Sequence, residues 1–218
     1  MIDSIELLIF TILPPLLKAS IITLQASIFG AIFGSIGGLC FGVLNSDRIK
    51  IKIISVLIGL YVIIVRGTPM FVQILFVYFA LPEMTHVNVS PIMAGIITIG
   101  LNSSAYLSEV VRGSINSLPN GQWESAEVLG YTRYQTIRHI ILPQALKNAL
   151  PVITNEFSTL VKESSVLMII GVPELVKTSR DIVARELRPI QIYLVTAFIY
   201  FVITGSIAFF TKRLERKI

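Results

Sequence analysis

Long, nearly uncharged apolar runs make this chain difficult to fold as a water-soluble domain. Of its 218 residues, 54% are hydrophobic and only 14% are charged, whereas soluble domains carry about 25% charged residues. A soluble chain of this length would still need a polar surface toward water. In a bilayer, the main-chain polar groups of an apolar run are satisfied when the run forms a helix. The sequence therefore predicts an all-α, polytopic membrane protein.

Five apolar segments are long enough to cross a bilayer, which takes about 20 helical residues. Gly30, Gly34 and Gly38 recur every fourth residue in the first segment, a spacing that predicts close packing against another helix. We expect one transmembrane domain, residues 1–218, with spans over residues 21–44, 53–79, 91–111, 149–170 and 190–210.

The basic residues predict the orientation of the spans. Loops rich in Lys and Arg face the cytoplasm. Because residues 81–90 contain neither Lys nor Arg, the N-terminus is expected outside and the C-terminus in the cytoplasm. One segment, residues 174–188, disagrees, since its Lys and Arg residues would be external. The net charge of +5 is therefore explained by the Lys and Arg residues that flank the apolar segments. It predicts no nucleic-acid partner. The expected cytoplasmic cations are Arg48, Lys50, Lys52, Arg112, Arg133, Arg138, Lys212, Arg213, Arg216 and Lys217.

Residues 119–143 form a polar stretch between the third and fourth spans that is too short and too polar to cross the membrane. Gly130 can end a first short helix. Thr132 can cap a second one, which Pro143 is expected to close. Ala126 and Gly130, four residues apart, would leave a smooth face for a partner. Spacing alone is equally compatible with an ordinary amphipathic connector.

The residue order in this stretch resembles the cytoplasmic loop of permease subunits of ATP-binding-cassette importers. That signature reads Glu-Ala-Ala, three residues, Gly, nine residues, Ile-x-Leu-Pro. The chain departs from it only at Ser125, where a small residue replaces alanine. The residues that the resemblance assigns to ATPase coupling are Glu124, Ser125, Ala126, Gly130, Ile140, Leu142 and Pro143.

Three further stretches narrow the resemblance to permeases for polar amino acids, the histidine, glutamine and arginine branch. Residues 66–73 resemble its Arg-Gly-Thr-Pro-x-x-x-Gln motif. Residues 105–113, followed by Gly121 and Gln122, are similar to the run that precedes its loop. Residues 162–165 with 170–175 resemble the end of its fourth helix. Together these stretches cover half of the chain in the same order.

The resemblance implies a five-helix subunit with the type I importer permease fold in the bacterial cell membrane. It would pair with itself or with a sister permease, and its loop would dock on a separate ATPase. An external solute-binding protein would deliver the substrate. The sequence has no G-x-x-x-x-G-K-[ST] phosphate loop. We therefore expect no enzymatic activity and no cofactor in this chain, with ATP and magnesium on the partner.

Polar residues inside the spans are candidates for substrate binding, because ionisable groups there face protein or water. Glu163 could meet the ammonium group or a basic side chain of an amino acid, and Arg66 its carboxylate. Glu156 lies nearer the cytoplasm and suits a gate. The alternative is that these charges form structural ion pairs, Lys162 with Glu163 or Arg66 with Glu156. The candidates are Glu163, Arg66, Glu156, Asn102, Asn155 and Thr159.

Two questions stay open at this stage. Arginine, lysine, histidine and glutamine all suit the candidate residues as substrates. The rival function is an ion-coupled secondary amino-acid transporter or a channel subunit, which would normally have more spans and inverted repeats than this chain shows.

Glu109 and Arg112, at the cytoplasmic edge of the third span, are expected to form a structural pair.

Overall fold

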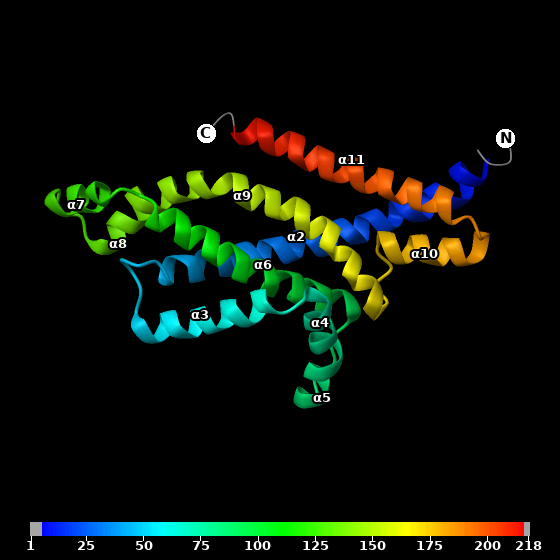
Figure 1. The fold of residues 1–218 in the computed structure, drawn as a ribbon, viewed down its shortest axis with the longest axis horizontal. Helices are drawn as coiled ribbons and strands as arrows, with labels where there is room; N and C mark the ends of the chain where they lie inside the picture. The colour runs from blue at the N-terminus through cyan, green and yellow to red at the C-terminus, as the bar shows by residue number, and fades with distance from the viewer. Residues whose placement is uncertain (1–5, 216–218) are drawn as a thin grey trace.

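The computed structural model describes residues 6–215, which fold into an elongated helical bundle without a β-strand in that range (Figure 1). The expected all-α class is confirmed. The long helices are α2 (Leu13–Leu44), α3 (Lys52–Gly67), α6 (Pro91–Asn116), α9 (Leu142–Glu163) and α11 (Pro189–Glu215). The shorter ones are η1 (Leu7–Ile12), α4 (Met70–Leu75), η2 (Phe76–Ala80), α5 (Leu81–Thr85), α7 (Asn120–Val128), α8 (Arg133–Thr136), η3 (Ile137–Ile141), η4 (Ser164–Ile170) and α10 (Leu175–Glu186).

Helices cover all five segments expected to span, although several run beyond the expected bounds. By length and composition, Phe10–Leu44 and Pro189–Arg213 qualify as spans among the described residues, and the bent pair α3 with α4–α5 counts as a third. The helices α6 and α9 do not meet this criterion. Both carry polar residues along their length, among them several of the candidate substrate residues.

The second expected span is strongly bent. The helix Lys52–Gly67 and the helical stretch Met70–Thr85 meet at 104°. The break falls at Thr68 and Pro69, which are both extended. Proline disfavours helix at the preceding residue and cannot donate a main-chain hydrogen bond. The predicted interruption is therefore confirmed, and it turns the chain almost at a right angle.

The glycines of α2 allow α6 to approach closely, as their spacing predicts. A Cβ atom added to Gly34 would lie 2.5 Å from the Cβ of Ser103, and one on Gly38 would lie 2.5 Å from the Cβ of Leu107. Real Cβ atoms do not come this close. The two helices are thus in main-chain contact along a row of small residues, the usual way in which membrane helices associate.

Each described π-helical segment ends two residues before a proline. They are η1 before Pro14, η2 before Pro82 and η3 before Pro143. The wider turn lets the N–H of Leu142 bond five residues back to Ile137. A proline ring clashes with the carbonyl four residues earlier in an ordinary α-helix, and the widened turn relieves that clash.

This arrangement corrects the expectation for Pro143. It does not close the second short helix, because α8, η3 and α9 form one continuous helical run through it. The fourth long helix consequently begins at Leu142 and not near residue 149.

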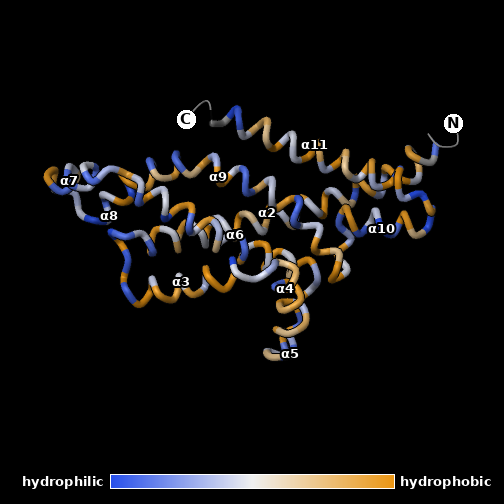
Figure 2. The backbone as a smooth tube through the Cα atoms, in the orientation of Figure 1, coloured by the Kyte–Doolittle hydropathy of each residue, from blue (hydrophilic) through white to orange (hydrophobic). Residues whose placement is uncertain are grey.

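The two ends of the bundle differ. The α7–α8 segment lies at one end, toward which the C-terminal end of α11 also points, and α10 lies at the other end, near the start of α2 (Figure 1). Ile12 and Leu16 form a core there with Leu175 of α10 and Ile192 of α11. Polar residues gather around α7, α8 and α10, whereas α3, α4 and α11 show long hydrophobic stretches (Figure 2).

Candidate functional site

The tip formed by α7 and α8 has the local structure that its sequence predicts. Gly130 has φ +76°. The N–H of Tyr131 donates to the oxygen of Ala126 at 3.0 Å, and that of Gly130 to Glu127 at 3.0 Å. These two bonds form a Schellman motif with Gly130 in the left-handed position. Thr132 then begins α8 through a reciprocal capping box with Gln135. The predicted turn at Gly130 and the cap at Thr132 are confirmed, although only α7 is a short separate helix, since α8 continues through η3 into α9.

Apolar side chains project from this tip. Val128 is 87% exposed, Leu129 is 73% exposed and Tyr134 is 65% exposed. Exposed apolar side chains on an otherwise polar segment are typical of an interaction surface. We call Val128, Leu129 and Tyr134 the apolar tip. None of its three residues is among the sequence-predicted coupling residues, although the adjacent pair Val128 and Leu129 in a polar stretch is a readable signal.

The predicted coupling residues divide into two groups. Glu124, Ser125, Gly130 and Pro143 are exposed. Ala126 is only 1% exposed, and Ile140 and Leu142 are half-buried. Ala126 therefore packs inside the subunit and does not form part of an exposed smooth face. Ile140 and Trp123 pack against a buried core of Val111, Ile115, Ile141 and Ala145, which fixes the tip to α6 and α9.

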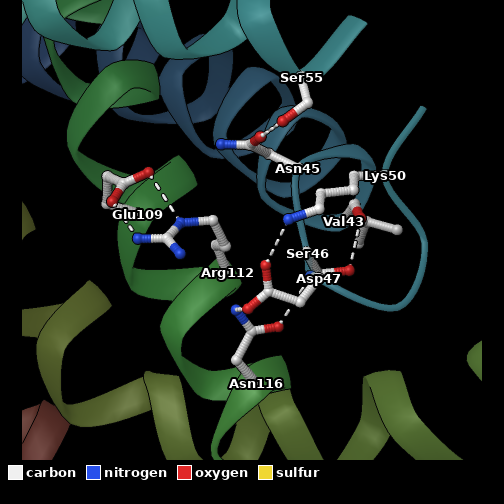
Figure 3. Close-up of polar contacts among 9 residues, drawn as sticks. All are labelled: Val43, Asn45, Ser46, Asp47, Lys50, Ser55, Glu109, Arg112 and Asn116. Atoms are coloured by element: carbon white, nitrogen blue, oxygen red, sulfur yellow. Dashed lines mark hydrogen bonds and ion pairs between the residues drawn. The ribbon is translucent and has the colours of Figure 1, made fainter. Parts of the chain in front are cut away.

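Glu109 and Arg112 form the structural pair expected of them (Figure 3). The guanidinium of Arg112 donates twice to the Glu109 carboxylate, at 3.0 and 2.6 Å. Both side chains border a groove of about 600 Å³ between α3 and α6. Arg66 lies on the same groove and is exposed, with its guanidinium 5.6 Å from the ring centre of Tyr106.

Glu156 lies in a different cavity, of about 470 Å³, between α2, α6, α9 and α11. This cavity is mostly apolar and also contains Ser103, whose buried hydroxyl has no hydrogen-bond partner among residues 6–215. Arg66 and Glu156 therefore do not meet. In the described part of the chain, neither of the two expected structural ion pairs, Arg66 with Glu156 or Lys162 with Glu163, is formed.

The remaining candidates are spread along α9 and α6. Glu163 is half-buried at the last residue of α9, whereas Asn155 is exposed. The Thr159 hydroxyl bonds within its own helix, to the oxygen of Asn155 at 3.3 Å. Asn102 donates to the Gln73 side chain at 3.2 Å. The six polar candidates thus do not share one cavity within the subunit.

A buried carboxylate that is not among the sequence-predicted site residues lies at the start of α10. Glu174 is fully buried and caps the helix by accepting from the N–H groups of Val176 at 2.9 Å and Lys177 at 2.7 Å. The Tyr200 hydroxyl approaches it at 3.4 Å. Burial raises the pKa of the Glu174 carboxyl, although these hydrogen bonds act in the opposite direction.

Comparison with known proteins agrees with this architecture. The chain is 35% identical over 210 residues to the glutamine transport system permease protein GlnP of Escherichia coli K12, covering 96% of this chain and 95% of that protein. It is 33% identical over 203 residues to a putative glutamine transport system permease protein GlnP of Rickettsia bellii, covering 93% and 92%.

Solved structures show the same fold. A crystal structure of an amino acid ABC transporter with histidines matches with a TM-score of 0.85 and 33% identity, over 94% of each chain. An inward-facing MetNI methionine ABC transporter matches with a TM-score of 0.84 and 19% identity, over 95% of this chain and 98% of that one, which supports the fold alone.

A family description, "Binding-protein-dependent transport system inner membrane component", matches residues 34–218. Subunits of this kind lie in the inner membrane, are not enzymes, and work with a separate ATPase and a second permease subunit. The chain belongs to the family of binding-protein-dependent transport system inner membrane components.

Proposed function

We propose that this chain is the permease subunit of an importer for polar amino acids, and that the apolar tip is its docking point on the ATPase. The observation that carries the docking role is the exposure of Val128 and Leu129 at a turn fixed by Gly130. The curated relatives are named as glutamine permeases, and the similar solved transporter holds histidines. Glutamine and cationic amino acids are therefore the first substrates to test.

The orientation follows from the docking role. The ATPase is cytoplasmic, so α7, α8 and the C-terminal end of α11 lie on the cytoplasmic side and the start of α2 lies outside. The basic segment around α10 is then external, where a solute-binding protein delivers the amino acid. ATP and magnesium bind the partner ATPase, and this chain holds no cofactor of its own.

The translocation pathway is proposed to lie between two permease subunits. Arg66, Asn155 and Lys162 are exposed on helices that cross the membrane. Charged groups at this depth avoid lipid and face water or protein. A pathway shared between subunits would gather Arg66, Glu163 and their neighbours, which one subunit alone does not bring together. Asn102, Asn155, Thr159 and Glu156 complete the proposed polar lining.

Docking is tested with Leu129→Asp, compared with Val87→Asp, which places the same charge on an exposed residue of the α5–α6 loop. The permease is co-purified with its ATPase in detergent. We expect Leu129→Asp to lose the ATPase and Val87→Asp to retain it. Equal recovery of the ATPase with both variants would contradict docking through the tip.

The substrate is tested by uptake into proteoliposomes that contain the complete transporter, using a panel of labelled amino acids. ATP-dependent import that is limited to polar amino acids supports the proposal. If none of these amino acids is taken up in an ATP-dependent way, the proposal is wrong. Glu163→Gln then separates two roles. We expect a larger loss for arginine than for glutamine if Glu163 holds a basic side chain, and equal losses if it holds the ammonium group.

A further inference from the structure

A short joint connects the docking helix to the body of the subunit. Helix α6 ends at Asn116 and α7 begins at Asn120, so only residues 117–119 lie between them. The joint has two main-chain bonds back into α6, from Ser117 to Gly113 at 2.9 Å and from Leu118 to Ile115 at 3.3 Å. A flexible joint here would absorb a movement of α7 instead of passing it on.

Asp47, in the connection between α2 and α3, binds the α6 side of this joint. Its main-chain N–H donates to Oδ1 of Asn116 at 3.0 Å, and Nδ2 of Asn116 donates back to its carboxylate at 2.8 Å (Figure 3). The two residues are 69 positions apart. This reciprocal pair fixes both the position and the orientation of the Asn116 side chain.

The next residue, Arg48, binds the α7 side. Its guanidinium donates to Oδ1 of Asn120 at 2.6 Å and lies 5.6 Å from the ring centre of Trp123. Asn120 is the first residue of α7, and Trp123 is one turn further along. Two consecutive residues of one loop thus hold the two helices on either side of the joint.

The loop that carries these residues is itself well held. Ser46 is fully buried, and its hydroxyl donates to the oxygen of Val43 at 2.8 Å. The N–H groups of Ile49 and Lys50 return to the oxygen of Ser46. The Lys50 ammonium lies 2.9 Å from the Asp47 carboxylate and keeps the pKa of that carboxyl below its usual value. The loop is therefore a fixed turn, which a brace requires.

We propose that Asp47 and Arg48 are positioning residues that brace the α6–α7 joint, so that a displacement of α7 by the ATPase is transmitted to α6. The inference rests on the proposed function, because it takes α7 as part of the docking segment. The hydrogen bonds of the brace are exposed to water, where each adds only modestly to stability. The brace is thus expected to affect energy coupling more than folding.

The test exchanges the two partners of the reciprocal pair. Asn116→Asp sets two carboxylates against each other and removes the donor amide. Asp47→Asn alone keeps an acceptor for Asn116, so its effect should be smaller. In the double variant the amide and the carboxylate change places, and both hydrogen bonds can form again.

The readout is the number of amino acids imported per ATP hydrolysed by the complete reconstituted transporter. We expect Asn116→Asp to keep its ATPase and hydrolyse ATP while this ratio falls about fivefold or more. The double variant should recover to within about twofold of the unmodified transporter. A merely structural role would lower assembly or thermal stability and leave the ratio unchanged in the assembled complexes.

Arg48 provides a second test that does not depend on the folding of Asn116→Asp. Arg48→Gln should lower the ratio, whereas Lys52→Gln, which removes the same charge from an exposed residue at the start of α3, should not. An unchanged ratio in Arg48→Gln overturns the brace, as does an Asn116→Asp loss that the double variant fails to recover.

Failure of the brace and failure of the proposed function give different results. If the unmodified transporter imports no amino acid, or Leu129→Asp keeps its ATPase, the proposed function is wrong. If the unmodified transporter imports and Leu129→Asp loses its ATPase, but Asn116→Asp and Arg48→Gln couple normally, only the brace is wrong.

Discussion

The side-chain amide of Gln73 donates to the main-chain oxygen of Val65 at 2.7 Å and to that of Thr68 at 3.0 Å. A residue of α4 thereby satisfies carbonyl groups at the end of α3, where the break leaves them without helical partners. Its own Oε1 accepts from Asn102 of α6. Inside a membrane, unpaired main-chain oxygens are costly. Gln73 is thus the residue that makes the bend at Pro69 tolerable.

Replacing Gln73 with Leu should destabilise the subunit. The substitution keeps the side-chain size but removes the donor, and each carbonyl left unsatisfied costs about 1–3 kcal/mol. Thermal unfolding of the purified transporter should show a lower Tm for Gln73→Leu. Val72→Leu, at an exposed neighbour, serves as the control and should keep its Tm. Equal Tm values in the two variants would mean that the bend does not depend on Gln73.

Gly130→Ala should weaken ATPase binding. An added Cβ has nothing within 4 Å at Gly130 or at Gly121, so neither substitution meets a steric obstacle. Of these two glycines, Gly130 alone has a positive φ, and holding alanine there costs about 1–2 kcal/mol. We expect affinity for the ATPase, measured with purified subunits in detergent, to fall about fivefold or more. Gly121→Ala lies in α7 and should maintain or improve binding.

Local features of the fold could be predicted from the sequence because short-range chemistry determines them. The turn at Gly130, the cap at Thr132 and the break before Pro69 each depend on a few adjacent residues. The glycine row of α2 correctly predicted a close neighbour. Pro143 was misjudged because the π-helical segment before it allows the helix to continue through the proline.

Long-range side-chain pairing could not be predicted in this way. Asp47 and Asn116 meet although 69 positions separate them, and nothing in either neighbourhood indicates the other. The six candidate substrate residues were grouped by depth in the membrane. Depth does not determine on which side of a helix a residue lies, so Arg66 and Glu156 border different cavities.

Gly38→Val should disrupt the contact between α2 and α6. The new Cβ would lie 2.5 Å from the Cβ of Leu107 and 3.2 Å from main-chain atoms, which cannot move aside easily. Overpacking of this kind costs about 1–3 kcal/mol or more. Gly59→Val, in the apolar helix α3 with no atom within 4 Å of the added Cβ, is the matched control. Thermal unfolding should show a loss for Gly38→Val alone; equal losses would assign the effect to helix propensity.

Stability should fall as the pH rises above the usual carboxyl pKa of 4.5, through the titration of Glu174. Its folded-state pKa is raised by burial, so the folded protein binds this proton more tightly than the unfolded chain does. The contribution of Glu174 to stability is then greatest at low pH and declines from about pH 4.5 until the buried carboxyl has ionised. Glu174→Gln, which stays neutral, should flatten this part of the profile of Tm against pH, whereas Glu83→Gln, at an exposed position, should follow the unmodified protein. If Glu174→Gln shows the same dependence on pH as the unmodified transporter, Glu174 is ionised in the fold at little cost and its two main-chain donors outweigh its burial.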